Sequence, residues 1–271
     1  MKCNNIYNLD CIEGLKKLEA NSIDVVVTSP PYNIGVNYGL HDDNLPFEEY
    51  LDWMEELGEE LSRVLKQEGS LFFNIGDKPS DSFRSMDVAK RIAKFFKLQN
   101  TIHWVKHIDI LRDEAPNLKE NISVGHYKPV NSQRFLNNCH EYIFHFTLSN
   151  KVKVDKLANG VPYADKSNIG RWKSAKQDKR ARGNMWFIPY KTVQSKKEHP
   201  AAYPVELPKR CIKLHGVEDD LKVLDPFMGS GSTAIAAKQL NCNYIGFEID
   251  QEYVKISNEN IDMPIQRKLI E

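Results

Sequence analysis

Apolar, β-branched runs alternate with segments of helical periodicity along this chain, and this alternation restricts its fold more than any other feature. The clearest run, residues 23–28, reads Ile-Asp-Val-Val-Val-Thr and stops at two consecutive prolines, as expected of a strand buried in a parallel sheet. Strands that alternate with helices pack as a layered sheet. We therefore predict an α/β domain, with strands at residues 5–9, 23–28, 69–75, 101–108, 140–147, 222–224 and 244–248 and helices at residues 12–18, 46–66, 82–96, 205–215, 232–240 and 251–260.

The alternation is interrupted twice. It gives way to a polar loop at residues 109–139 and to a segment rich in basic and turn-forming residues at 148–198. The 271 residues suffice for one large domain with a sizeable core. We expect one α/β domain in two halves, residues 1–147 and 199–271, with residues 148–198 inserted between them and the loop 109–139 contributing to the insert.

The charge of the chain sums to zero, with 37 basic and 37 acidic residues, but it is unevenly distributed. Residues 41–60 hold nine acidic residues and no Lys or Arg, whereas residues 151–213 hold 16 Lys and Arg against 5 Asp and Glu, a net charge of +11. Aromatic residues and glycines are interleaved with these cations, a mixture suited to a loop-rich surface that meets nucleic acid. A solvated basic surface is the equally weighted alternative.

Several classes of protein are disfavoured by composition. Five widely spaced cysteines without a C-x-x-C pair predict neither a disulfide framework nor a zinc ribbon. His103 and His107 are four apart but lie in a strand-like segment, so we expect no metal site. No apolar run approaches the roughly 20 residues that span a bilayer, and the first residues lack an apolar signal core. We therefore expect a soluble, intracellular protein.

Two unusual loops, residues 28–33 and 225–233, follow predicted strands, and ligands of open parallel sheets bind beyond the carboxyl ends of the strands. We expect the two loops to be neighbours. In the second loop, Gly229 and Gly231 allow close approach of backbone to a ligand, and Ser232 or Thr233 is expected to cap the next helix. The spacing of these glycines matches neither a dinucleotide fingerprint nor a phosphate-binding loop.

Two carboxylates stand at strand ends near the second loop. Asp225 would attract a cation, and Glu248 is placed like the acid that binds ribose hydroxyls in nucleoside-binding sheets. S-adenosylmethionine carries both a ribose and positive groups, and it fits this pair. Capping of the following helices is the structural alternative for both residues.

The first loop combines a rigid backbone with hydrogen-bond acceptors. Pro30 and Pro31 restrict the chain, so that the Ser29 hydroxyl and the Pro30 carbonyl form a fixed acceptor cluster beside the ring of Tyr32. A base with an exocyclic amine could donate to these acceptors while its face stacks on the ring. The alternative is an ordinary Pro-Pro turn with a core tyrosine.

Together the two loops resemble the beta-class amino-methyltransferases of DNA found in restriction-modification systems, which methylate the exocyclic nitrogen of cytosine or adenine. The catalytic motif is Ser29, Pro30, Pro31 and Tyr32, and the cofactor motif is residues 225–233. The resemblance extends over almost the whole chain. It implies the S-adenosylmethionine-dependent methyltransferase fold, a Rossmann-like, mostly parallel sheet flanked by helices, with circularly permuted motif order and an inserted target-recognition region at residues 148–198.

The resemblance also implies roles for individual residues. For S-adenosylmethionine these are Asp10, Cys11, Ser29, His199, Pro200, Tyr203, Asp225, Phe227, Gly229, Ser230, Gly231, Ser232, Thr233 and Glu248. For DNA, the basic insert and the amide-rich stretch before residue 140 suggest Arg134, Arg171, Trp172, Lys173, Lys179, Arg180 and Arg182. Sequence does not separate base readers from phosphate binders among them.

The family's cytosine-N4 members usually carry Ser at the first catalytic position and its adenine-N6 members Asp, so Ser29 favours cytosine N4, with adenine N6 as the alternative. Duplex DNA is the expected partner, with a cognate restriction endonuclease and a homodimer as further implications of the resemblance. RNA is a rival substrate. Glutamine methylation by enzymes with an N-P-P-Y motif is disfavoured by Ser29, and an inert DNA-binding scaffold is disfavoured by the intact motifs.

Overall fold

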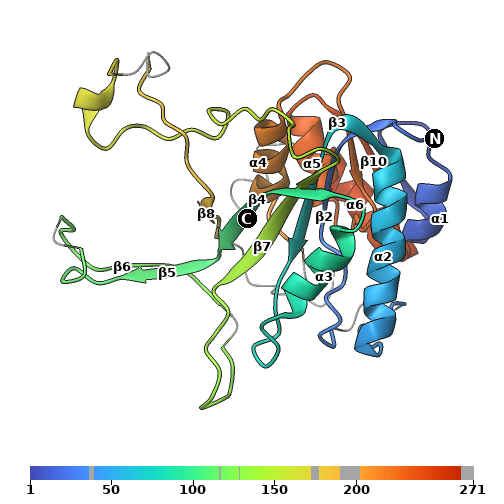
Figure 1. Ribbon diagram of the computed structural model, residues 1–271, viewed down its shortest axis with the longest axis horizontal. Coiled ribbons are helices and arrows are strands. Elements are labelled where there is room, and N and C mark those ends of the chain that lie inside the picture. The colour runs from blue at the N-terminus through green and yellow to red at the C-terminus, as the bar shows by residue number, and fades with distance from the viewer. Residues whose placement is uncertain (37–39, 116, 128, 172–176, 190–201, 264–271) are drawn as a thin grey trace.

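The computed structural model describes residues 1–36, 40–115, 117–127, 129–171, 177–189 and 202–263 (Figure 1). The helices of this part are α1 Cys11–Lys16, α2 Phe47–Val64, α3 Arg84–Ile92, α4 Glu206–His215, α5 Ser232–Gln239, α6 Gln251–Asp262 and the short 3₁₀ helix η1 Lys166–Asn168. Its strands are β1 Asn5–Asn8, β2 Ile23–Thr28, β3 Leu65–Ile75, β4 Lys97–Val105, β5 His107–Ile110, β6 Ile122–Gly125, β7 His140–Thr147, β8 Met185–Phe187, β9 Lys222–Asp225 and β10 Asn243–Glu248.

The main sheet of the described residues has eight strands in the order β1-β10-β9-β2-β3-β7-β4-β8. Strands β1, β10, β9, β2 and β3 run parallel to one another, and β4 pairs in parallel with β8. Strand β7 runs antiparallel to both of its neighbours, β3 and β4. The prediction of an α/β domain with a mostly parallel sheet is confirmed.

Helices cover both faces of the sheet, which explains why β2 is apolar without alternation. Val26 packs into the core formed with α1, α2 and α3, whereas Val25 and Val27 pack into the core formed with α4, α5 and α6 (Figure 1). Side chains of a strand point alternately to the two faces, so a strand buried on both faces needs apolar residues at successive positions.

Each predicted helix and strand has a counterpart in the structure, but several bounds differ: β3 begins at Leu65 rather than at residue 69, and α3 ends at Ile92 rather than at residue 96. The predicted strand at 101–108 divides into β4 and β5, and β5 pairs with β6, which arises in the segment expected to be a polar loop. Strand β8 lies within residues 148–198 and pairs with β4 in the main sheet. Both β6 and β8 are too short for their periodicity to be recognised, and β8 is fixed by the burial of Trp186 opposite Trp104.

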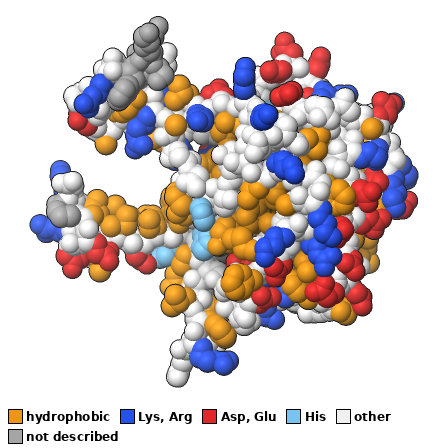
Figure 2. All heavy atoms as spheres, in the orientation of Figure 1, with side chains coloured by type: hydrophobic (Ala, Val, Ile, Leu, Met, Phe, Trp, Pro, Cys, Tyr) orange, Lys and Arg blue, Asp and Glu red, His pale blue; other side chains and the backbone are white. Residues whose placement is uncertain are grey.

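Two projections extend from one side of the molecule (Figure 1). One is the hairpin β5–β6, and the other is the segment that contains η1, between β7 and β8. The space-filling view shows an open space between them (Figure 2). Acidic side chains gather over α2, on the opposite side of this view, where Arg91 forms salt bridges with Glu48 and Glu55.

Candidate active site

The two motif loops lie side by side at one edge of the sheet. Strands β2 and β9 are parallel neighbours, so the loops that leave them start at the same edge. The hydroxyl of Thr28, the last residue of β2, donates a hydrogen bond of 2.9 Å to Oδ1 of Asp225, the last residue of β9. This contact confirms the expectation that the loops are neighbours.

Asp225 is buried, and protein donors surround its carboxylate. Oδ1 accepts hydrogen bonds from Thr28 and from the backbone N–H of Phe227 at 3.0 Å, and Oδ2 accepts from the hydroxyls of Tyr203 at 2.8 Å and Thr233 at 2.6 Å. Burial raises the pKa of Asp225 although these hydrogen bonds oppose the shift. Each carboxylate oxygen has two lone pairs, so the four donors fill Asp225. These contacts position the two loops, a role that the sequence did not predict for Asp225, and its expected interaction with a ligand cation stays a prediction.

The start of α5 differs from the expected cap. Gly231, at φ 91°, is the N-cap residue, and no side chain caps the helix. The hydroxyl of Ser232 instead donates to the carbonyl of Tyr203 at 2.7 Å, and that of Thr233 is bound to Asp225. The expected capping role of Ser232 and Thr233 was wrong because both hydroxyls are used to join the loop to Tyr203 and Asp225.

Glu248, at the end of β10, has the properties expected of a ligand-binding carboxylate. Oε2 accepts from the backbone N–H of Gly229 at 2.8 Å and Oε1 from that of Asp250 at 2.9 Å, so each oxygen keeps a lone pair for a further donor. Burial raises the pKa of Glu248. Neither Glu248 nor Asp225 caps a helix, because Asp250 caps α6 and Gly231 begins α5.

The structure describes most of the other residues expected to bind the cofactor and gives each of these a protein contact or a buried position. Asp10 follows β1, the neighbour of β10, and its Oδ1 accepts from the N–H groups of Ile12 at 2.8 Å and Glu13 at 3.2 Å, which caps α1. The half-buried ring of Phe227 meets the ring of Trp53 edge-on at 5.8 Å. Cys11 is buried next to Asp10, the carbonyl of Ser230 accepts from Asn260, and Tyr203 is buried. His199 and Pro200 lie outside the described residues.

The catalytic loop is fixed on both sides of its tyrosine. The hydroxyl of Tyr50 in α2 donates to the carbonyl of Pro31 at 2.8 Å. The buried carboxylate of Asp43 accepts three backbone N–H groups directly after the motif, from Asn33 at 2.7 Å, Ile34 at 3.1 Å and Val36 at 2.9 Å. Ser29 and Tyr32 are half-buried, so a rigid loop presents them.

A polar cluster that the sequence did not predict joins Ser29 and Tyr32 to two other strands. Ser29 Oγ lies 2.8 Å from the hydroxyl of Tyr32, which donates to Oε2 of Glu141 at 2.8 Å. Asn74 Nδ2 donates to Glu141 Oε2 and to the Tyr32 hydroxyl, each at 2.7 Å, and lies 3.3 Å from Ser29 Oγ. Lys106 forms a salt bridge with Oε1 of Glu141. The sequence signal that could have predicted this cluster is the presence of Asn74 and Glu141 near the ends of otherwise apolar strands.

Electrostatics keeps Glu141 ionised in this interior position. Burial alone would raise the pKa of Glu141, but the charge of Lys106 and the hydrogen bonds from Lys106, Asn74 and Tyr32 outweigh it, so the pKa is lowered. Oδ1 of Asn74 is buried and has no hydrogen-bond partner among the described residues. An acceptor of this kind is satisfied when a bound group supplies an N–H or O–H.

The residues expected to bind DNA lie outside the main sheet, Arg134 in the loop between β6 and β7 and the others described in the segment that contains η1. The guanidinium of Arg134 stacks on the ring of Phe135 at 5.2 Å. Arg171 and Arg180 are exposed, whereas Lys179 and Arg182 are half-buried, and Arg182 Nε donates to the carbonyl of Asn159 at 3.2 Å. Trp172 and Lys173 lie outside the described residues.

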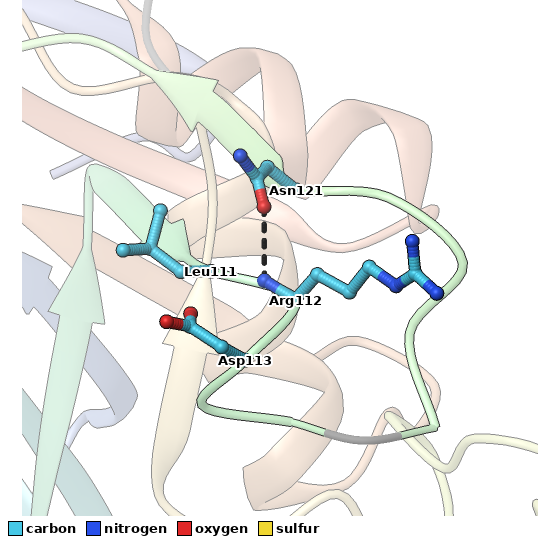
Figure 3. Close-up of a pocket in the computed structure, with 4 residues that line it drawn as sticks. All are labelled: Leu111, Arg112, Asp113 and Asn121. Carbon is cyan, nitrogen blue, oxygen red and sulfur yellow. Dashed lines mark hydrogen bonds between the residues drawn. The ribbon is translucent and has the colours of Figure 1, made fainter.

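A shallow hollow at the tip of the β5–β6 hairpin is separate from the strand-end site. It is lined by Leu111, Arg112, Asp113 and Asn121 (Figure 3). The side-chain oxygen of Asn121 accepts a hydrogen bond of 2.9 Å from the backbone N–H of Arg112 and ties the two sides of the hollow together. The hollow is therefore a structural feature of the β5–β6 hairpin.

Metal-binding side chains do not gather within the described ranges. No group of three or more His, Cys, Asp or Glu side chains there is placed to hold a metal ion. The ring of His103 lies 5.7 Å from that of His140, and His107 Nε2 lies 2.7 Å from Asp109.

No helix among the described residues is both long and apolar enough to cross a bilayer.

Known proteins resemble this chain in sequence and in fold. The Type II methyltransferase M.HpaI of Haemophilus parainfluenzae is 30% identical over 93% of this chain and 72% of its own length. The DNA adenine methyltransferase YhdJ of Escherichia coli (strain K12) is 26% identical over 95% of this chain and 82% of its own.

Among solved structures, the PvuII DNA methyltransferase (cytosine-N4-specific) superposes with a TM-score of 0.67 at 21% identity, covering 98% of this chain and 89% of its own. The DNA modification methylase TTHA0409 of Thermus thermophilus, complexed with S-adenosyl-L-methionine, gives a TM-score of 0.60 at 23% identity over 95% of this chain and 92% of its own. A family model of the N6/N4 methyltransferases, described as DNA methylase, matches residues 23–259. The chain therefore belongs to the N6/N4 family of DNA methylases.

Proposed function

We propose that this methylase transfers the methyl group of S-adenosylmethionine to the N4 amine of a cytosine flipped out of duplex DNA at a specific sequence. The observation that carries the proposal is the half-buried hydroxyl of Ser29, which stands at the sheet edge shared by the catalytic and cofactor loops and is held 2.8 Å from the Tyr32 hydroxyl. A fixed acceptor at this position suits an amine that must be oriented before it reacts.

The cofactor edge fits S-adenosylmethionine in its chemistry. Glu248 keeps a lone pair on each oxygen for a ribose hydroxyl. Gly229 and Gly231 have φ of 51° and 91°, a backbone conformation that favours glycine and that shapes the loop beside Glu248. When bound, S-adenosylmethionine would supply a methyl carbon for the amine nitrogen to attack as the carbon–sulfur bond breaks, with S-adenosylhomocysteine as the leaving group and one amine proton lost afterwards. Asp225 contributes by holding the loop through its four protein donors.

The catalytic loop prepares the amine for that displacement. Ser29 Oγ and the carbonyl of Pro30 accept hydrogen bonds from the exocyclic N–H groups, which draws the nitrogen lone pair out of conjugation with the ring. Tyr32 stacks on the base and compensates part of the few kcal/mol that flipping costs. Alignment at a fixed loop supplies much of the rate of a direct transfer.

Duplex DNA lies, in this proposal, along the open space between the two projections. Arg171 and Arg180 contact phosphates or bases from the segment that contains η1, and Arg134 does so from the loop between β6 and β7. Residues 148–198 with the loop 109–139 form the target-recognition region. The acidic surface over α2 faces away and orients the encounter. We further propose that the methylation protects DNA from a cognate restriction endonuclease and that the methylase forms a homodimer.

Adenine N6 is the second candidate, favoured by the similarity to the adenine methyltransferase YhdJ. Incubation with labelled S-adenosylmethionine and plasmid DNA, followed by digestion and identification of the labelled nucleoside, separates the two. We expect N4-methylcytosine. N6-methyladenine would replace the cytosine assignment, and label in RNA or protein but not in DNA would overturn the proposal.

A further inference from the structure

Three hydrogen-bond donors from three segments converge on one carboxylate behind the catalytic loop. Glu141 in β7 accepts from Tyr32 and Asn74 at Oε2 and from Lys106 at Oε1. Glu141 and Lys106 are 13% and 17% exposed in their side chains, so the salt bridge is largely withdrawn from water. A buried ion pair contributes little net stability, because the cost of removing both charges from water offsets their attraction. Stability alone therefore does not explain this pair.

The directions of the hydrogen bonds follow from which groups can donate. An ionised carboxylate only accepts, so the single hydroxyl hydrogen of Tyr32 points to Glu141. The Tyr32 oxygen must then accept in its contact with Ser29, and the single hydroxyl hydrogen of Ser29 points to Tyr32. The two short contacts of Asn74 Nδ2 use its two hydrogens on Glu141 and Tyr32, and its contact to Ser29 is longer, at 3.3 Å. Ser29 Oγ is left with lone pairs to offer.

We propose that Glu141, oriented by Lys106, is a positioning residue that sets the direction of the chain Ser29, Tyr32, Glu141, so that Ser29 faces the substrate amine as an acceptor. The inference rests on the proposed function, because an acceptor is required only if the substrate group is an N–H donor. It adds a residue from β7, 112 positions after Ser29, whose influence passes through Tyr32.

The substitution Glu141→Gln tests the direction rather than the mere presence of the side chain. Lys106 can only donate, so the oxygen of the introduced amide must face Lys106 and the amide NH₂ must face Tyr32. Asn74 would lose its acceptor on residue 141 but still donate to Tyr32. Tyr32 would then have Ser29 as its acceptor and donate to it, and Ser29 would point its hydrogen at the substrate. The change from carboxylate to amide preserves the shape of the side chain but reverses the chain.

The first experiment compares Glu141→Gln with wild type and with Glu68→Gln, the same chemical change at an exposed position of β3. We expect Glu141→Gln to bind S-adenosylmethionine normally in calorimetry but to transfer methyl groups to DNA about 10-fold to 100-fold more slowly in a single turnover, the loss typical of one charge-assisted hydrogen bond. Glu68→Gln should match wild type. Equal single-turnover rates for Glu141→Gln and wild type would overturn the inference.

A second pair of variants removes the buried charges and so keeps the test valid should Glu141→Gln fold poorly. In Lys106→Met/Glu141→Gln the amide is free to turn its oxygen to Tyr32, whereas Lys106→Met/Glu141→Leu has no acceptor. We expect the glutamine double variant to be faster than the leucine double variant and faster than Glu141→Gln alone. Equal rates in the two double variants would show that direction is irrelevant and would refute the inference.

The outcomes separate this inference from the proposed function. Wild-type protein that binds S-adenosylmethionine but labels no DNA, while labelling another substrate, contradicts the proposed function. Wild-type protein that methylates DNA, with both double variants equally fast, contradicts only the role of Glu141.

Discussion

Thr28 and Asp225 join the catalytic loop to the cofactor loop through a hydrogen bond of 2.9 Å between the Thr28 hydroxyl and Oδ1 of the carboxylate. Both residues are buried and each is the last residue of its strand. The spacing between the loops is therefore set by a side-chain contact as well as by the pairing of β2 with β9.

Thr28→Val keeps the shape of this side chain and removes its hydroxyl. One buried carboxylate oxygen then loses a donor, which typically costs about 1–3 kcal/mol. We expect the free energy of unfolding in urea to fall by that amount and the affinity for S-adenosylmethionine to fall with it. Thr101→Val, at a half-exposed position of β4, serves as the control. Stability equal to wild type in Thr28→Val would contradict the proposed link.

Asp225 and Glu248 should respond differently to neutral isosteres. Asp225→Asn turns an NH₂ toward protein donors, so we expect a large loss of stability, about 3 kcal/mol or more, together with loss of cofactor binding. Glu248→Gln also turns its NH₂ toward one backbone N–H, of Gly229 or Asp250, but at a half-buried position. We expect weaker binding of S-adenosylmethionine with a smaller loss of stability than in Asp225→Asn. Urea unfolding and calorimetry on both variants test the contrast. An Asp225→Asn protein as stable as wild type but unable to bind the cofactor would instead favour a direct contact.

Ser29→Ala should separate binding from turnover. The methyl side chain keeps the loop intact but cannot accept a hydrogen bond, and loss of one oriented group in a site of this kind costs about 10²–10³ in rate. We expect unchanged affinity for S-adenosylmethionine and this loss in the single-turnover rate. Ser62→Ala in α2 is the matched control. Unchanged turnover in Ser29→Ala would show that the serine is not the acceptor.

Acid should destabilise the fold through a histidine network beside the middle of β3. His145 Nε2 lies 3.0 Å from Ser70 Oγ, which lies 2.9 Å from His215 Nδ1, and His145 Nδ1 accepts from Asn100 Nδ2 at 2.9 Å. Burial lowers the pKa of His145 to about 3, and burial also lowers the pKa of His215. The unfolded chain therefore binds protons more readily than the folded protein.

The sign of the pH effect follows. The stabilising contribution of neutral His145 is complete above the unfolded pKa of about 6.5 and decreases as the pH falls, by about 1.4 kcal/mol per pH unit, until the folded pKa near 3 is reached. Unfolding in urea at pH 7.5, 6.5, 5.5 and 4.5 measures it. We expect a shallower dependence in His145→Gln than in wild type or in His126→Gln. Parallel curves for all three proteins would count against the network.

Salt should weaken DNA binding through the inserted region. Each phosphate contact adds about one to the slope of log affinity against log salt concentration. We expect Arg171→Gln and Arg180→Gln each to make the fall of affinity with salt less steep by about one unit of this slope. Fluorescence anisotropy on a duplex oligonucleotide measures it. Lys90→Gln, an exposed cation of α3, should leave it unchanged. Affinity that does not vary with salt would contradict a phosphate-binding insert.

Sequence predicted what local pattern determines. The apolar run of β2 and the proline pair after it needed no tertiary information, and neither did the glycines of the cofactor loop. The cluster of Asn74, Lys106 and Glu141 was not predicted, because its members come from three segments that become neighbours only through the sheet order. The cap of α5 was predicted incorrectly for a related reason, since Thr233 has a distant carboxylate partner, Asp225, that outweighs the local one.

The reversed direction of β7 decides what its two ends can reach. Because β7 runs against β3, Glu141 near its start meets Asn74 near the end of β3, whereas a parallel strand of eight residues would carry its first side chains to the far edge, roughly 20–25 Å away. The loop after β6 therefore enters β7 at the sheet edge that holds the active site, and the segment that contains η1 leaves β7 at the opposite edge. Strand β7 separates the two segments by a fixed distance. Each segment can therefore change in length and sequence without moving Glu141 from Asn74.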